Sequence, residues 1–138
     1  MDQKIIEKAA GFISANGLEC VMAVIDFDGY PTASTISVSK NEGISSLSFC
    51  TSFDSIKVKR IQKCNYASVC ISSSEPFFNI TLVGKIEVIT DPKIKKEMWY
   101  DGLEHYFTGY EDENYCVLKF VTERYKLFID EDEVEGKF

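Results

Sequence analysis

The segment between residues 48 and 61 carries the strongest chemical signal in the sequence. An apolar run passes into hydroxyl residues, and a helix then begins in which Lys57 falls in the first turn. The helix dipole disfavours a cation there by about 0.3–1 kcal/mol, and a bound anion would remove that penalty. The hydroxyls of Thr51, Ser52 and Ser55 add donors around the same free amides. These residues together predict a phosphate-binding site at the helix N-terminus.

The same segment also has an interpretation without a ligand. Lys59 and Arg60 follow closely behind Lys57, and a run of basic residues usually forms a solvated helix face. Composition alone does not separate a phosphate site from an ordinary capped helix, so both interpretations stay open at this point.

A longer pattern that contains these residues resembles a known family. Thr51-x3-Ser55-x-Lys57-x3-Ile61-x3-Asn65 is similar to the flavin-phosphate segment of the pyridoxamine 5′-phosphate oxidase-like superfamily, within it most of all to the general stress protein 26-like group. The resemblance covers roughly residues 12–128. It implies a mainly β fold, an antiparallel Greek-key split β-barrel with a few helices that binds FMN. It also implies a homodimer that holds FMN at its interface.

The resemblance assigns a role to each candidate residue. Thr51, Ser55 and Lys57 would hold the phosphate. The ring and the ribityl chain would lie against small residues that follow the turn at residues 29–31, and against the strand before the phosphate segment: Ser34, Thr35, Ile36, Phe49 and Cys50. Trp99 of the second subunit would close the site. Without the resemblance, residues 32–39 are typical of a polar-faced edge strand, and Trp99 of plain packing.

Bulk properties limit the class of protein. The chain has 138 residues, which fits one domain spanning residues 1–138. A net charge of −7 argues against a general binder of nucleic acid or anionic membranes. No apolar run approaches the roughly 20 residues that span a bilayer, and no secretory apolar region follows Met1. We therefore expect a cytoplasmic protein without a nucleic-acid or membrane partner.

Side-chain catalysis and metal binding have little support in the sequence. The five cysteines are irregularly spaced and His105 is the only histidine, so we expect neither a metal site nor a disulfide framework. A single histidine also gives no catalytic triad, and the sequence names no catalytic acid or base. Cys50 is the cysteine nearest the predicted phosphate segment.

The local patterns predict about seven strands and three helices, joined mostly by hairpins, as in a closed or partly closed antiparallel barrel. Asp54 or Ser52 is expected to cap the second helix, and Gly84 to mark a bulge. The expected helices are 2–15, 54–63 and one starting at Pro92. The expected strands are 19–27, 32–39, 44–50, 66–72, 77–90, 115–120 and 124–130, with a turn at 40–43 and a fraying acidic tail at 130–135.

The first functional interpretation is an FMN-binding flavoprotein and oxidoreductase, in which the flavin carries the redox chemistry. Pyridoxamine 5′-phosphate oxidase itself fits less well, because residues 122–138 lack the arginine- and histidine-containing substrate segment of that enzyme. A non-enzymatic flavin or haem carrier or sensor remains open, with His105 as the haem ligand, and so does a dimeric scaffold without a cofactor. An absorption spectrum separates these classes.

Overall fold

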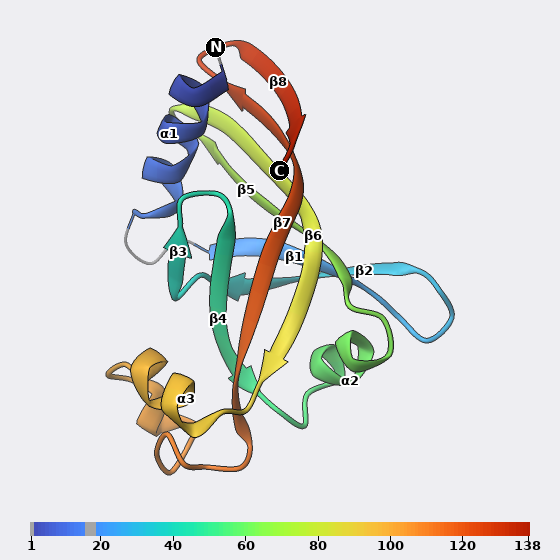
Figure 1. Cartoon of the computed structure of the whole chain (residues 1–138), viewed down its shortest axis with the longest axis vertical. Helices are drawn as coiled ribbons and strands as arrows, with labels where there is room; N and C mark the ends of the chain where they lie inside the picture. Colours follow the sequence, from blue (N-terminus) through green and yellow to red (C-terminus); the bar gives the residue numbers. More distant parts are fainter. Residues whose placement is uncertain (1, 16–18) are drawn as a thin grey trace.

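A computed structural model describes residues 2–15 and 19–138 (Figure 1). Its strands form one antiparallel sheet in the order β2-β1-β5-β6-β7-β4-β3, and β8 also pairs with β7. The strands are β1 (Glu19–Ile25), β2 (Pro31–Ser37), β3 (Lys40–Glu42), β4 (Ser46–Ser52), β5 (Tyr66–Ser74), β6 (Phe77–Ile89), β7 (Tyr115–Ile129) and β8 (Asp132–Lys137). The helices are α1 (Asp2–Ile13), α2 (Ile56–Lys63) and α3 (Pro92–Met98), and η1 (Leu103–His105) is a 3₁₀ turn. The mainly β prediction is confirmed, although β2 and β3 form open edges and the sheet does not close.

The structure corrects the sequence-based boundaries at two hairpins and in one strand. The expected turn at 40–43 contains β3, which pairs with β4. The two strands expected at the end of the chain are one continuous strand, β7. The acidic tail does not fray, because Asp130 and Glu131 have φ values of 53° and 67° and make a two-residue turn that returns the chain as β8.

Gly84 marks a bulge, as predicted. Val83 pairs with Arg124 and Gly84 pairs with Thr122, so Glu123 is an extra residue on β7. A Cβ atom on Gly84 would lie 1.9 Å from the Val121 carbonyl oxygen, which leaves room for glycine alone. The bulge keeps β7 continuous through the stretch where the sequence had predicted a break.

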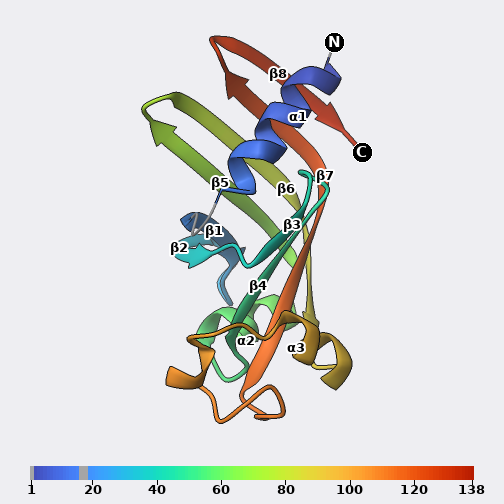
Figure 2. The same cartoon turned by 90° about the vertical axis from the view of Figure 1, so that its left-hand side faces the viewer.

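The helices lie at two ends of the sheet. Figures 1 and 2 show α1 near the N-terminus at one end and α2 and α3 at the other. The main core contains buried residues of most strands together with α1 and α2, and Phe12 of α1 stacks on Phe78 with ring centroids 4.1 Å apart. A smaller cluster beneath α3 is built on Tyr115 and Val117 of β7. Within the described residues, none of the helices has the length and apolar character needed to span a membrane.

Candidate functional site

The first turn of α2 begins at a serine cap. The Val58 amide donates to Ser55 Oγ at 3.3 Å, so the cap is Ser55 and the prediction of Asp54 or Ser52 was wrong. Ser55 has extended backbone angles, which an N-cap residue needs, and its own carbonyl accepts the Lys59 amide at 3.2 Å. The amides of Ile56 and Lys57 have no partner among the described residues. As predicted, Lys57 lies in the first turn, beside these free donors.

A hollow of about 220 Å³ lies between this turn and β2. We call it the basic hollow; it is lined by Val24, Thr32, Ala33, Ser34, Ile56, Lys57 and Arg60. Lys57 and Arg60 are three residues apart on α2 and therefore share a helix face. Thr32 and Ser34 alternate with Ala33 along β2 and share one face of that strand.

The cations of the basic hollow are not neutralised within the described part of the chain. Arg60 Nη1 donates to Thr32 Oγ1 at 3.1 Å, while the buried Arg60 Nε has no partner there. The ion pairs of the described residues are elsewhere, between Lys8 and Asp130, Lys85 and Glu123, and Lys126 and Glu133. A guanidinium nitrogen buried without an acceptor is costly, so the hollow is suited to an anion.

Partial burial changes the pKa of Lys57. Desolvation lowers the pKa of its ammonium from 10.5, and the nearby Cys20 thiol opposes that shift. The cation has lost part of its hydration and has no carboxylate partner among residues 2–15 and 19–138. An anion with several acceptor oxygens would compensate both Lys57 and Arg60.

A second hollow, of about 260 Å³, lies between the ends of β2 and β4 and the segment that follows α3. We call it the aromatic hollow; it is lined by Ser37, Cys50, Thr51, Ser52, Tyr100, Leu103, Tyr106 and Phe107. None of these side chains carries a formal charge at neutral pH. Burial raises the pKa of the Cys50 thiol, and the sulfur lies 3.7 Å from both the Met98 carbonyl oxygen and the Tyr115 hydroxyl. Cys50 is therefore a neutral thiol at pH 7, and the hollow is suited to an uncharged, planar group.

The structure divides the predicted site residues between these two hollows. Ser34 and Lys57 line the basic hollow, and Cys50 and Thr51 line the aromatic hollow. Ser55 lies beside the basic hollow as the helix cap. Most of the predicted set is thus placed around β2, β4 and the start of α2.

Four predicted residues are placed differently. Ile36 lines neither hollow and packs, partly buried, against the main core. Phe49 is 0% exposed in the main core, so its side chain cannot contact a ligand and only its main chain could do so. Thr35 pairs with Val21 and lies on the opposite face of β2 from Ser34 and Ile36. Trp99 packs edge-on against Tyr115 of its own chain, with ring centroids 5.4 Å apart.

Arg60 and Thr32 line the basic hollow but were not among the site residues predicted from the sequence. The signal for Arg60 was available, because a cation three positions after Lys57 on a helix must lie near it. Thr32 could not be found in that way, since its contact with Arg60 depends on how α2 packs against β2. The Thr32 hydroxyl donates to the Val24 carbonyl at 3.0 Å, which leaves its oxygen oriented to accept from Arg60.

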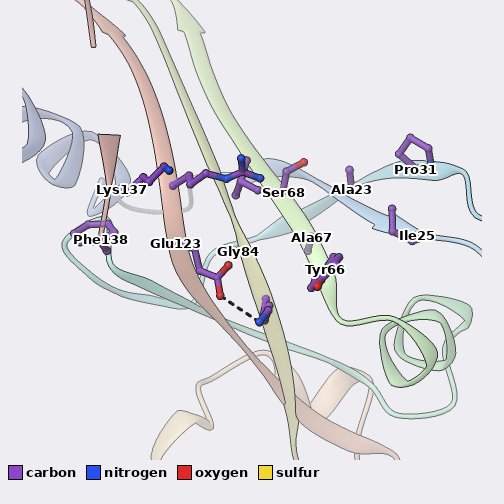
Figure 3. A pocket seen from close by; sticks show the side chains of 13 residues that line it. Ala23, Ile25, Pro31, Tyr66, Ala67, Ser68, Gly84, Glu123, Lys137 and Phe138 are labelled. Atoms are coloured by element: carbon purple, nitrogen blue, oxygen red, sulfur yellow. Dashed lines mark ion pairs between the residues drawn. The ribbon is translucent and has the colours of Figure 1, made fainter. Parts of the chain in front are cut away.

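A third and broader hollow, of about 1010 Å³, lies on the outer face of the sheet (Figure 3). Ala23 and Ile25 of β1 point into it, and Tyr66, Glu123 and Phe138 line other parts of it. In contrast to the basic hollow, its charges are partly matched, because Lys85 Nζ lies 3.5 Å from Glu123 Oε2. We call this surface the outer-face hollow.

The chain belongs to a known protein family. Residues 8–128 match the family model described as pyridoxamine 5′-phosphate oxidase like. No curated protein sequence matches the chain. The family assignment agrees with the resemblance found in residues 51–65, and it covers both hollows around β2.

Solved structures with the same fold include three that are informative. A Clostridium acetobutylicum protein related to general stress protein 26 of Bacillus subtilis, of the pyridoxinephosphate oxidase family, has a TM-score of 0.86 at 23% identity, covering 100% of this chain and 97% of that one. A pyridoxamine 5′-phosphate oxidase-related, FMN-binding protein from Nostoc punctiforme has a TM-score of 0.70 at 12% identity, covering 99% and 94%. A haem-binding protein from Mycobacterium smegmatis has a TM-score of 0.77 at 16% identity, covering 96% of this chain and 57% of that one. At these identities the likeness establishes the split-barrel fold and no more.

Proposed function

We propose that the protein binds FMN and acts as an FMN-dependent oxidoreductase. The observation that carries this proposal is the basic hollow, where Lys57 and the buried Arg60 Nε lack an acceptor among the described residues. A terminal phosphate supplies several acceptor oxygens and a negative charge at a helix N-terminus, which is the environment that the free amides of α2 favour. Membership of the pyridoxamine 5′-phosphate oxidase-like family and the FMN-binding Nostoc protein support the same cofactor.

The second support is the relation of the two hollows along β2. Ser34 lines the basic hollow and Ser37, at the end of the same strand, lines the aromatic hollow. At about 3.3 Å per residue the two positions are about 10 Å apart. Side chains three positions apart on a strand face opposite sides, so an extended ligand with a phosphate at one end and a planar ring at the other would pass round β2, which is an edge strand of the sheet.

The role of the protein in this proposal is to bind and orient. FMN, when bound, supplies the redox chemistry. Lys57 and Arg60 hold the phosphate, with Ser34 and Ser55 as further hydroxyl partners. Cys50 and Tyr100 line the uncharged hollow for the ring, and the raised pKa of Cys50 keeps a thiolate away from it. In this proposal none of the described residues acts as a catalytic acid or base.

Titration of the flavin-free protein with FMN, riboflavin and FAD tests the cofactor. Riboflavin lacks the phosphate, and in FAD the phosphate is not terminal, so FMN should bind most tightly. A charge-assisted contact is worth about 1.5–3 kcal/mol, so riboflavin should bind at least tenfold more weakly. Equal affinity for FMN and riboflavin would refute the phosphate role of the basic hollow.

We further propose a homodimer with the flavin at its interface. Exposed apolar side chains on and around the outer-face hollow support this, with Val21 43% exposed, Tyr66 60% and Phe138 64%. In the proposal Trp99, which is partly exposed, lies close to the partner's flavin. Light scattering on the flavin-loaded protein tests the oligomeric state, and a stable monomer that retains flavin would refute the dimer.

The site gives no support to a haem-binding function. His105 is exposed on η1 and lines neither the basic nor the aromatic hollow. The absorption spectrum of the purified protein checks this directly, because flavin bands and a Soret band are easily distinguished. A Soret band that disappears in His105→Ala would overturn the FMN assignment.

A further inference from the structure

We propose that Asn114, which lies outside both hollows, is a positioning residue for the phosphate site. Its side chain holds the turn that leads into α2 and so fixes the first turn that carries Lys57. The inference rests on the proposed FMN function and adds to it a residue that does not contact the cofactor.

The contact is made by both the main chain and the side chain of Asn114. The Phe53 amide donates to the Asn114 carbonyl at 2.7 Å, and the Asp54 amide donates to Asn114 Oδ1 at 2.9 Å. These two amides immediately precede Ser55, the cap of α2. Asn114 therefore satisfies two donors that would otherwise be free just before the helix begins.

Asn114 is itself fixed by hydrogen bonds within the loop before β7. The carboxylate of Asp112 accepts the Asn114 amide through Oδ1 and the Thr108 amide through Oδ2, both at 2.9 Å. Lys95, only 6% exposed, donates from Nζ to the Asp112 carbonyl at 2.9 Å, and its ammonium lies 5.3 Å from the centroid of the Tyr115 ring. The Tyr115 hydroxyl in turn donates to the Lys95 carbonyl at 2.9 Å.

These bonds connect α3, the loop before β7 and the start of α2. Figures 1 and 2 show the loop before β7 at the same end of the molecule as α2 and α3. The loop is thus braced against α3 by Lys95 and against the β4–α2 turn by Asn114. A displaced turn would move the free amides of Ile56 and Lys57, and charge-assisted hydrogen bonds depend strongly on distance and angle.

The experiment compares FMN and riboflavin binding by wild type and Asn114→Ala. The substitution removes the bond to the Asp54 amide and leaves the main-chain bond to the Phe53 amide. We expect FMN affinity to fall about five- to tenfold, while riboflavin affinity changes less than twofold. Asn41→Ala is the matched control. Asn41 lies on β3, where its side chain donates to the Gly43 carbonyl and accepts from the Ser14 hydroxyl, and it lines neither hollow, so both affinities should stay as in wild type.

Two outcomes would overturn the inference and leave the proposed function intact. In the first, wild type prefers FMN and Asn114→Ala keeps the same preference. In the second, Asn114→Ala loses affinity for FMN and riboflavin equally while its far-ultraviolet circular dichroism spectrum is unchanged. Equal binding of both flavins by wild type would refute the proposed function and this inference with it. If Asn114→Ala does not fold, Asn114→Ser is used in its place. The serine hydroxyl is one bond closer to the backbone than Asn114 Oδ1 and so cannot reach the Asp54 amide. Hydrogen exchange of the Asp54 amide in that variant should be faster than in wild type, and unchanged exchange would refute the positioning role.

Discussion

The basic and aromatic hollows lie at opposite ends of β2 and differ in how their polar groups are satisfied. Lys57 and Arg60 both line the basic hollow, and neither forms an ion pair with a carboxylate among the described residues. In the aromatic hollow, the lining is uncharged and the Cys50 thiol already lies near the Met98 carbonyl and the Tyr115 hydroxyl. The difference indicates that the basic hollow recognises a charged group, while the aromatic hollow recognises an uncharged ligand group by contact area and shape.

The largest expected effect comes from removing a cation of the basic hollow. Lys57→Ala should weaken FMN binding by about 1.5–3 kcal/mol, or about one to two decades in dissociation constant. Riboflavin binding should be nearly unchanged, because it has no phosphate. Lys59→Ala is the control, since Lys59 does not line the hollow. Flavin fluorescence titration measures the dissociation constants of both variants for FMN and for riboflavin. Equal losses of FMN affinity in the two variants would show that α2 offers only a general basic face.

A somewhat smaller change in FMN affinity is expected when pH removes the charge of Lys57. Because burial lowers the pKa of Lys57 from 10.5, the free protein loses this charge at a lower pH than an exposed lysine does. The ratio of FMN affinity to riboflavin affinity should therefore decline as the pH rises toward 10.5, and this decline should be absent in Lys57→Ala. Riboflavin is the control, because it shares the ionisable ring of FMN and lacks the phosphate. A pH profile of FMN binding that is the same in wild type and Lys57→Ala would contradict the assignment.

A substitution in the aromatic hollow should act on both flavins alike. Tyr100 is 47% exposed and lines this hollow, and an aromatic contact is worth about 0.5–1.5 kcal/mol. Tyr100→Ala should weaken FMN and riboflavin by the same factor of about two- to tenfold. Calorimetric titration with each flavin checks the ratio, and Tyr30→Ala serves as a control because Tyr30 is exposed and lines neither hollow. A loss confined to FMN would place the phosphate in this hollow and reverse the comparison.

The smallest effect is expected at the histidine. His105 is exposed and lies outside both hollows, so His105→Ala should change flavin affinity and the rate of flavin reduction less than twofold. Anaerobic reduction by a nicotinamide donor, followed at the flavin absorption band, measures the rate. A large loss of reduction with normal binding would show that the imidazole takes part in the chemistry.

The residues that the sequence predicted correctly are those whose roles depend on local order. Lys57 in the first turn of α2 and the bulge at Gly84 follow from helix and strand rules that need only neighbouring residues. Alternation along a strand could also have separated Phe49, on the core side of β4, from Cys50 on the other side.

Other features depend on contacts between distant segments and were not predictable in this way. The acidic tail became β8 because it pairs with β7, where Gly136 lies against the ring of Tyr125. The bond between Arg60 and Thr32 requires α2 to be docked on β2. The same holds for Asn114, whose bond to the Asp54 amide joins residues 60 positions apart.

The length and position of β7 also bear on how the chain folds during synthesis. β7 pairs with β4, β6 and β8, and its partners in β4 lie more than sixty positions earlier in the sequence. On the ribosome, one edge of β4 and one edge of β6 therefore stay unpaired until residues 115–129 have emerged. Such non-local pairing slows folding and leaves strand edges exposed to other chains. The nascent protein is most vulnerable to aggregation in the interval between completion of β6 and arrival of β7, when a chaperone that shields strand edges would raise the yield of folded protein.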